Sequence, residues 1–270
     1  MPEELIAANT KPWVQVLGGR LLAERALRGN FHRVWLHLEP AALAWRRTPP
    51  AERVPAIFTC THTSWWDGYL TWPLNRALGG REAFMMMDEA SLRHFRFFTW
   101  MGLYGVDRAN PRAALRSIEY SADLLRAAPH RALWIFPQGT ILPPDRRPLD
   151  LFPGVAHIAR RVPLCDVVPI AWRLEYRYEQ RAEIFVRVGA PIRVTAADGG
   201  GSRALTARID AALTAEADRL HAALTDGDIS RPLPGYVAIM RGRPSINRVW
   251  ETVQAGARRL LGRPSLPPAP

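Results

Sequence analysis

Long apolar runs and secretion signals are missing from this chain of 270 residues. None of its segments reaches the about 18 consecutive apolar residues that a membrane-spanning helix needs. The N-terminus also lacks the charged start and the apolar core of a secretion signal. We therefore expect neither a spanning helix nor a secretory leader.

Cysteine is scarce as well. Cys60 and Cys165 are the two cysteines, and each stands inside an apolar, strand-like run. Buried free thiols are therefore expected in place of a disulfide, which suits a reducing cytoplasm. No Cys/His cluster exists, and the acidic residues Asp88, Glu89 and Asp145 do not have the spacing of a metal site. We therefore expect neither a bound metal nor a resident cofactor.

Lysine is almost absent, although the chain is strongly basic. Arginine supplies 35 of the 36 basic residues, and against 25 acidic residues the net charge is +11. Such a charge favours an anionic partner. No nucleic-acid reading motif is recognisable, so an anionic membrane surface is the expected partner and no nucleic acid is expected. A hydrophobic content of 48% with 23% charged residues is typical of a globular protein.

The first fifty residues have an amphipathic pattern. One predicted helix carries apolar side chains on one side and charged ones on the other; the apolar set is Trp13, Val14, Leu17, Leu21 and Leu22, and the charged set is Arg20, Glu24, Arg25 and Arg28. A second helix is predicted from Phe31, Val34, Trp35 and Leu38, at the spacing i, i+3, i+4 and i+7. Residues 1–50 are therefore predicted to associate with a membrane surface. The alternative is that these helices pack on the protein's own core.

Strands and helices alternate through the middle of the chain. The expected strands are 54–60, 83–87, 102–108, 134–140, 165–172 and 183–188, and the expected helices are 89–101, 111–127 and 203–224. This alternation predicts an α/β fold with a central mixed β-sheet flanked by helices. We expect an α/β domain at 51–225 and a basic C-terminal extension at 226–270, with a helix at 246–261 and a disordered, proline-rich end.

A histidine and a carboxylate stand five residues apart just after the first of these strands. His62 precedes Asp67 at the junction between strand 54–60 and a helix that Ser64 is suited to cap. Neutral imidazole accepts a proton near pH 7, and a carboxylate stabilises the imidazolium that forms. The pair therefore predicts a proton-handling site, whereas an ordinary loop histidine beside a first-turn acid is the simpler alternative.

Three further blocks follow in order. Gly102 to Arg108 ends a short strand in a basic residue, Trp134 to Thr140 is an apolar strand broken at Pro137-Gln138-Gly139, and Val168-Pro169-Ile170 lies in a later strand. With the H-x-x-x-x-D pair, these blocks resemble the glycerolipid and lysophospholipid acyltransferase superfamily, in which the 1-acylglycerol-3-phosphate acyltransferases are included. The four blocks cover residues 54–172.

The resemblance implies an enzyme that moves an acyl group from a coenzyme A or carrier-protein thioester to a hydroxyl of a lipid. It assigns His62 as general base and Asp67 as its orienting partner, and it places the acceptor at Arg108, Gln138, Gly139 and Thr140. The Gly139 N–H is a candidate donor to the oxyanion of the tetrahedral intermediate. The chain departs from the family where Gln138 replaces a usual glutamate and Ile141-Leu142 replaces the residues that often follow the threonine.

These departures leave the acceptor open. Arg108 remains in its block, and Arg112, Arg146 and Arg147 are further candidate contacts to an anionic headgroup. An acyl-thioester hydrolase and a non-catalytic lipid-binding protein are the alternative functions. The expected location is peripheral, at the cytoplasmic face of a membrane.

Overall fold

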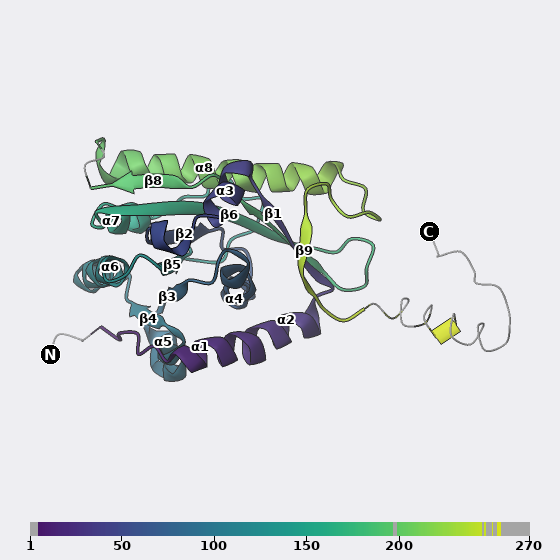
Figure 1. Cartoon of the computed structure of the whole chain (residues 1–270), viewed down its shortest axis with the longest axis horizontal. Helices are drawn as coiled ribbons and strands as arrows, with labels where there is room; N and C mark the ends of the chain where they lie inside the picture. Colours follow the sequence, from purple (N-terminus) through teal and green to yellow (C-terminus); the bar gives the residue numbers. More distant parts are fainter. Residues whose placement is uncertain (1–4, 197–198, 245, 247–249, 251–252, 255–270) are drawn as a thin grey trace.

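One β-sheet with helices on both faces makes up the structure (Figure 1), a computed structural model that describes residues 5–196, 199–244, 246, 250 and 253–254. The strands are β1 Arg33–Leu38, β2 Ala56–Cys60, β3 Glu82–Asp88, β4 Leu103–Val106, β5 Arg131–Ile135, β6 Leu164–Glu175, β7 Glu183–Val188, β8 Ile192–Thr195 and β9 Val237–Arg241. Their order is β4-β3-β5-β2-β6-β7-β1-β9, and β8 also pairs with β6. The α/β class and the mixed sheet predicted from the sequence are thus confirmed.

The helices lie on the two faces of this sheet. They are α1 Pro12–Gly18, α2 Arg25–Asn30, α3 Pro40–Arg46, α4 Asp67–Ala77, α5 Glu89–His94, α6 Pro111–Arg126, α7 Gly154–Ala159 and α8 Gly201–Asp226, with a π-helical segment η1 Gly19–Glu24 between α1 and α2 and two 3-10 segments, η2 Pro50–Glu52 and η3 Arg96–Met101. In Figure 1 the long helix α8 runs along one border of the molecule, and the α1–α2 stretch runs along the opposite border.

The five strands β4, β3, β5, β2 and β6 are parallel neighbours. Helices cover both faces of a parallel sheet, so its strands are apolar on both sides. Strand β2 shows this, because all five of its residues are buried. Phe58 packs with Trp134 on one face at a ring-centroid distance of 4.4 Å, whereas Ile57 joins a second apolar cluster with Ile158 and Ile209. The sheet therefore has one core on each side.

The parallel direction brings three predicted site residues to one edge of the sheet. Strands β2, β4 and β5 end at Cys60, Val106 and Ile135, and His62, Arg108 and Gln138 follow within three residues of those ends. Because the carboxyl ends of parallel strands lie at the same edge, loops that are distant in sequence meet there. This edge is the expected place for a ligand in an open α/β sheet.

The helix predicted from Phe31, Val34, Trp35 and Leu38 is wrong, because residues 33–38 form the strand β1. β1 pairs parallel with β7 and antiparallel with β9. Val34 and Leu36 pack into one apolar cluster and Trp35 packs into another, on the opposite face. A strand requires a period of two, which Val34, Leu36 and Leu38 also satisfy. Pairing with the neighbouring strands favours the strand over the helix.

The two outer segments of the chain both contribute to the sheet. β1 lies within residues 1–50 and β9 lies within residues 226–270, where no strand is predicted from the sequence. The predicted boundaries at residues 50 and 225 are therefore not boundaries of the sheet. Most of the predicted helix at 246–261, and the proline-rich end, lie outside the described residues.

The predicted helix at 89–101 is interrupted. α5 ends at His94, and Phe95 takes non-helical backbone angles before the 3-10 segment η3 begins at Arg96. The expected helices at 111–127 and 203–224 are confirmed as α6 and α8.

The α1–η1 part of the N-terminal stretch packs on the protein mainly through its small residues, whereas α2 buries Leu27. Gly18 and Gly19 are buried, and a β-carbon on either would come within 2.9 Å of the side chain of Met101 or Trp72, respectively. Most bulky apolar residues of α1 and η1 point the other way and are exposed; the exposed set is Trp13, Val16, Leu17, Leu21 and Leu22. This arrangement is the reverse of the usual surface helix, which buries its large apolar side chains. Among the described residues, none of the helices combines the length and the apolar composition that crossing a membrane requires.

Candidate active site

His62 and Asp67 meet in the turn between β2 and α4. The Nδ1 atom of His62 lies 2.8 Å from Oδ2 of Asp67, and the Asp67 side chain is only 1% exposed while that of His62 is 22% exposed. The imidazole therefore keeps contact with the outside, whereas its carboxylate partner is sealed in the turn. The predicted pair is present with hydrogen-bonding geometry.

Both carboxylate oxygens of Asp67 accept hydrogen bonds in this turn. Its Oδ2 also accepts from the backbone N–H groups of Thr63 at 2.6 Å and Ser64 at 3.0 Å, and its Oδ1 accepts from the Ser64 hydroxyl at 2.8 Å. An ionised carboxylate only accepts hydrogen bonds, so the His62 nitrogen that faces it must carry the proton. The Nε2 atom is then the free base of neutral His62.

The third block wraps around His62. The Phe136 ring stacks on the imidazole at a centroid distance of 4.6 Å and an interplanar angle of 26°. The buried Gln138 side chain accepts a hydrogen bond from the His62 backbone N–H at 2.7 Å, and the Leu142 N–H donates to the His62 carbonyl at 2.9 Å. His62 is therefore held through its ring, its N–H and its carbonyl by residues of one loop.

Arg108 joins the same edge of the site, next to Gly139. Gly139 has a φ of +67°, and a β-carbon there would lie 1.9 Å from Nη1 of Arg108. The guanidinium also lies over the Phe152 ring, 6.0 Å from its centroid. Thr140 is exposed in the same turn. The second and third blocks are thus brought together as the resemblance implies.

The Gly139 N–H does not fit the role of oxyanion donor. It donates to the Phe136 carbonyl at 3.0 Å, within the tight turn that the left-handed glycine makes. A donor already used inside a turn is not directed at a ligand. The expectation for this group is therefore corrected.

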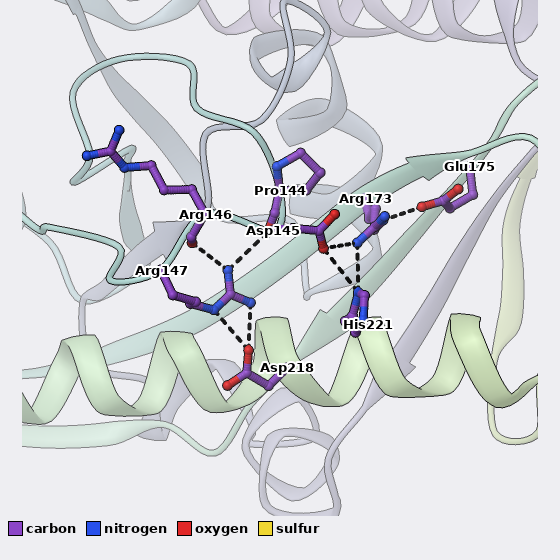
Figure 2. A network of polar contacts seen from close by, with 8 residues as sticks. All are labelled: Pro144, Asp145, Arg146, Arg147, Arg173, Glu175, Asp218 and His221. Atoms are coloured by element: carbon purple, nitrogen blue, oxygen red, sulfur yellow. Dashed lines mark hydrogen bonds and ion pairs between the residues drawn. The ribbon is translucent and has the colours of Figure 1, made fainter.

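The two arginines of the following loop have protein partners (Figure 2). Nε and Nη2 of Arg147 donate to Oδ1 of Asp218 in α8 at 2.9 and 2.7 Å, and its Nη1 donates to the carbonyls of Pro144 and Arg146. Arg146 pairs more loosely with Asp150, at 3.3 Å. The Arg147 guanidinium thus has its partners in α8 and in its own loop, and it anchors that loop to α8.

A second contact holds the same loop to the sheet and to α8. Asp145 bonds to Arg173 of β6 and lies 3.0 Å from Nδ1 of His221 in α8, as Figure 2 shows. The hydrogen bond from Arg173 holds the pKa of the Asp145 carboxyl below its usual range. Arg112, the remaining candidate anion contact, is exposed in the first turn of α6.

Cys60 lies under the site as an inert thiol. It is fully buried, and burial raises the pKa of the Cys60 thiol well above its usual value, with the charge of Asp67 raising it further. A protonated thiol is a poor nucleophile. Both cysteines are free and buried, as the sequence predicts.

Sequence reasoning missed three contributors to the site. Ser64 was expected as a helix cap, but its hydroxyl supports Asp67 as well as the Trp66 N–H. Leu142 bonds to His62 through its backbone, for which no side-chain pattern exists. Phe152 lies further along the chain and packs beside Arg108 and Gly139. An aromatic residue in a proline-rich loop was the sequence feature that could have indicated this contact. In the described part of the chain, three or more metal-ligating side chains are nowhere grouped together.

Comparison with known proteins gives one family. The acyltransferase family model matches residues 46–173, which include all four blocks. Among solved structures, the chain is similar to the 1-acyl-sn-glycerophosphate (LPA) acyltransferase PlsC from Thermotoga maritima, with 13% sequence identity, a TM-score of 0.49, and coverage of 79% of this chain and 84% of that one. No curated protein matches the chain in sequence. Residues 46–173, a little under half of the chain, thus match the acyltransferase family, as the four blocks lead one to expect.

Proposed function

We propose that the protein transfers a fatty acyl group from an acyl thioester to a hydroxyl group of a lipid acceptor, with His62 as the general base. The observation that carries this proposal is the 2.8 Å contact between Nδ1 of His62 and Asp67. It leaves Nε2 as the free base of a side chain that is 22% exposed, and Asp67 is placed to stabilise the imidazolium.

The reaction is a direct displacement. Nε2 of His62 takes the proton of the acceptor hydroxyl while the oxygen attacks the thioester carbonyl carbon. The tetrahedral intermediate collapses, the carbon–sulfur bond breaks, and the departing thiolate takes the proton from the imidazolium. An ester and a free thiol result, and His62 is neutral again. The step requires neither a covalent enzyme intermediate nor a cofactor, and the thioester, of coenzyme A or of a carrier protein, is a co-substrate.

The acceptor site is proposed at Arg108 and Thr140. The Arg108 guanidinium is exposed beside Gly139, one residue from the side chain that bonds to His62. A guanidinium is well suited to hold a phosphate or carboxylate group. We therefore propose an acceptor lipid with an anionic headgroup, and Arg108 would place that group next to the catalytic imidazole. Arg112 and Arg146, which are also exposed, are weaker candidates for the same contact.

A peripheral position on an anionic membrane is part of the proposal. The exposed apolar side chains of α1 and η1 continue onto η3, which contacts α1 and exposes Phe97 and Trp100. Exposed arginines stand among them, at positions 20, 25, 93 and 96. An apolar surface of this kind with cationic neighbours is typical of helices that lie in the headgroup layer. The cytoplasmic leaflet, which carries the anionic lipids, is the proposed location.

The activity is tested by thiol release from a long-chain acyl-coenzyme A. Purified protein is mixed with 1-acylglycerol phosphate, with neutral monoacylglycerol, or with no acceptor, and the products are identified by mass spectrometry. We expect acceptor-dependent release with the anionic lipid, and loss of that release in His62→Ala. Release without any acceptor would instead identify a thioesterase. If no thiol is released from acyl-coenzyme A or from a carrier-protein thioester, even with a pooled lipid extract as acceptor, the transferase is refuted and a lipid-binding protein is favoured.

The membrane position is tested by sedimentation with vesicles. Wild-type protein is expected to sediment with vesicles that contain about 30% anionic lipid, and binding should weaken as salt screens the arginines. A Trp13→Ala/Leu21→Ala variant should lose most of this binding, whereas Tyr176→Ala, at an exposed aromatic residue outside α1, η1 and η3, should not. Equal binding by both variants would contradict the proposed surface.

A further inference from the structure

The side chain of Gln138 is buried and faces the backbone of His62. Its residue is 4% exposed, and its Oε1 atom lies 2.7 Å from the His62 backbone nitrogen, 76 residues away in the sequence. The family resemblance implies an acceptor contact at this position. The geometry gives the side chain another partner.

The chemistry of this contact is defined by the donor. A backbone N–H only donates, so the atom that faces it must be an acceptor, which assigns the amide oxygen of Gln138 to this place. A buried backbone N–H that loses its partner is costly, because water cannot replace the hydrogen bond. The contact therefore restrains the start of the turn that carries the imidazole.

Gln138 acts together with its neighbours in the third block. Phe136 stacks on the ring of His62, and the Leu142 N–H holds the carbonyl of His62. Gln138 holds the N–H, so both peptide groups of His62 are bonded to the same loop. Within His62, Asp67 bonds to the imidazole and not to the peptide groups. Orientation of the ring toward a substrate requires both sets of contacts, because rotation of the backbone would move Nε2 even with Asp67 in place.

We propose that Gln138 is a positioning residue for the general base and not a contact to the acceptor. The proposal rests on the proposed acyl transfer and deepens it. Its physical basis is that this position needs a hydrogen-bond acceptor of fixed length, and either an amide oxygen or a carboxylate oxygen provides one. A methyl thioether of similar length fills the space without accepting strongly.

The kinetic test compares Gln138→Met with Gln138→Glu. We expect Gln138→Met to lower kcat by about tenfold to a hundredfold, the loss expected when a catalytic group is misplaced by up to about 1 Å. The KM for the acceptor should stay within about twofold. Gln138→Glu should recover at least tenfold of the lost kcat, because its carboxylate accepts the same hydrogen bond. Ile141→Ala, at an exposed residue of the same loop, is the matched control.

A change in the acceptor KM in place of kcat would overturn the proposal. If Gln138 contacts the acceptor, Gln138→Met will raise the acceptor KM and leave kcat nearly unchanged, as Arg108→Ala is expected to do. If Gln138→Met does not fold, Gln138→Glu decides alone: an acceptor KM raised about tenfold by charge repulsion would refute the positioning role, and an unchanged KM would support it.

A readout that does not need activity separates this inference from the proposed function. The chain has seven histidines, so protein labelled with 15N-histidine gives few backbone amide signals. The His62 signal is identified by its loss in His62→Ala. We expect its proton resonance to move upfield in Gln138→Met and to stay near its position in Gln138→Glu. A signal unmoved in Gln138→Met refutes the hydrogen bond, whether or not wild-type protein transfers acyl groups.

Discussion

The guanidinium of Arg108 lies directly against the backbone of Gly139, so that any side chain at residue 139 collides with it. A β-carbon would stand 1.9 Å from Nη1 of Arg108 and 3.1 Å from the Phe152 ring. Gly139 also has a φ of +67°, which L-residues with a side chain rarely adopt. The second and third blocks are therefore in contact at a residue whose left-handed backbone and close neighbours favour glycine.

Gly139→Ala is expected to displace Arg108 and to strain the turn. The displaced guanidinium should raise the KM for an anionic acceptor about tenfold, which corresponds to the loss of one charge-assisted hydrogen bond. The left-handed backbone should lower the free energy of unfolding by about 1–2 kcal/mol. Acceptor titrations and denaturant unfolding measure the two effects. Gly154→Ala, where no heavy atom lies near the added carbon, is the control and should change neither quantity.

Asp67→Asn is expected to remove most of the activity. The asparagine offers one oxygen where the carboxylate accepts four hydrogen bonds, and its amide N–H group faces backbone donors. Loss of the correct imidazole tautomer should lower kcat by about a hundredfold to ten-thousandfold, as for an orienting carboxylate in a serine protease. Steady-state kinetics measure the change. Ser64→Ala removes only one of the four bonds and should cost less than about tenfold; a kcat within threefold of wild type in Asp67→Asn would remove the orienting role.

Alkylation of the cysteines should be slow in the folded protein. Both thiols are buried, and the pKa of Cys60 is raised by burial and by Asp67, so the reactive thiolate is scarce at pH 8. Iodoacetamide should leave wild-type activity unchanged during a time in which both thiols of denatured protein are fully modified. Mass spectrometry counts the labels. Rapid loss of activity together with labelling of Cys60 would show instead that this thiol is accessible and used.

Arg147 and Asp218 should give the same phenotype when either is replaced. The two are joined by a partly exposed ion pair that anchors loop 144–147 to α8 (Figure 2). Arg147→Ala and Asp218→Ala should each lower stability by at most about 1 kcal/mol and change the acceptor KM equally and slightly. If Arg147 bound the acceptor's headgroup, only Arg147→Ala would raise the KM. Arg146→Ala, whose contact to Asp150 is longer, serves as the comparison in acceptor titrations.

The central strands and the chemistry at their ends were predictable because both are local. Val54 to Cys60 is an apolar run whose period allows burial on both faces, and His62 and Asp67 follow it within one turn. The helix predicted at 31–38 failed for the complementary reason. Its apolar residues satisfy a helical period and a strand period at once, and pairing with β7 and β9 decides between them.

The α/β alternation and the residues at the strand ends could be read from the chain, because neighbours in the sequence specify periodicity and turns. Which side chains meet depends on the folded arrangement. Gln138 reaches His62 across 76 positions and Arg147 reaches Asp218 across 71. Such pairs depend on strand order and on helix docking, and both result from many weak packing interactions acting together. The same packing turned the small residues of α1 and η1 inward and left Trp13 and Leu21 exposed.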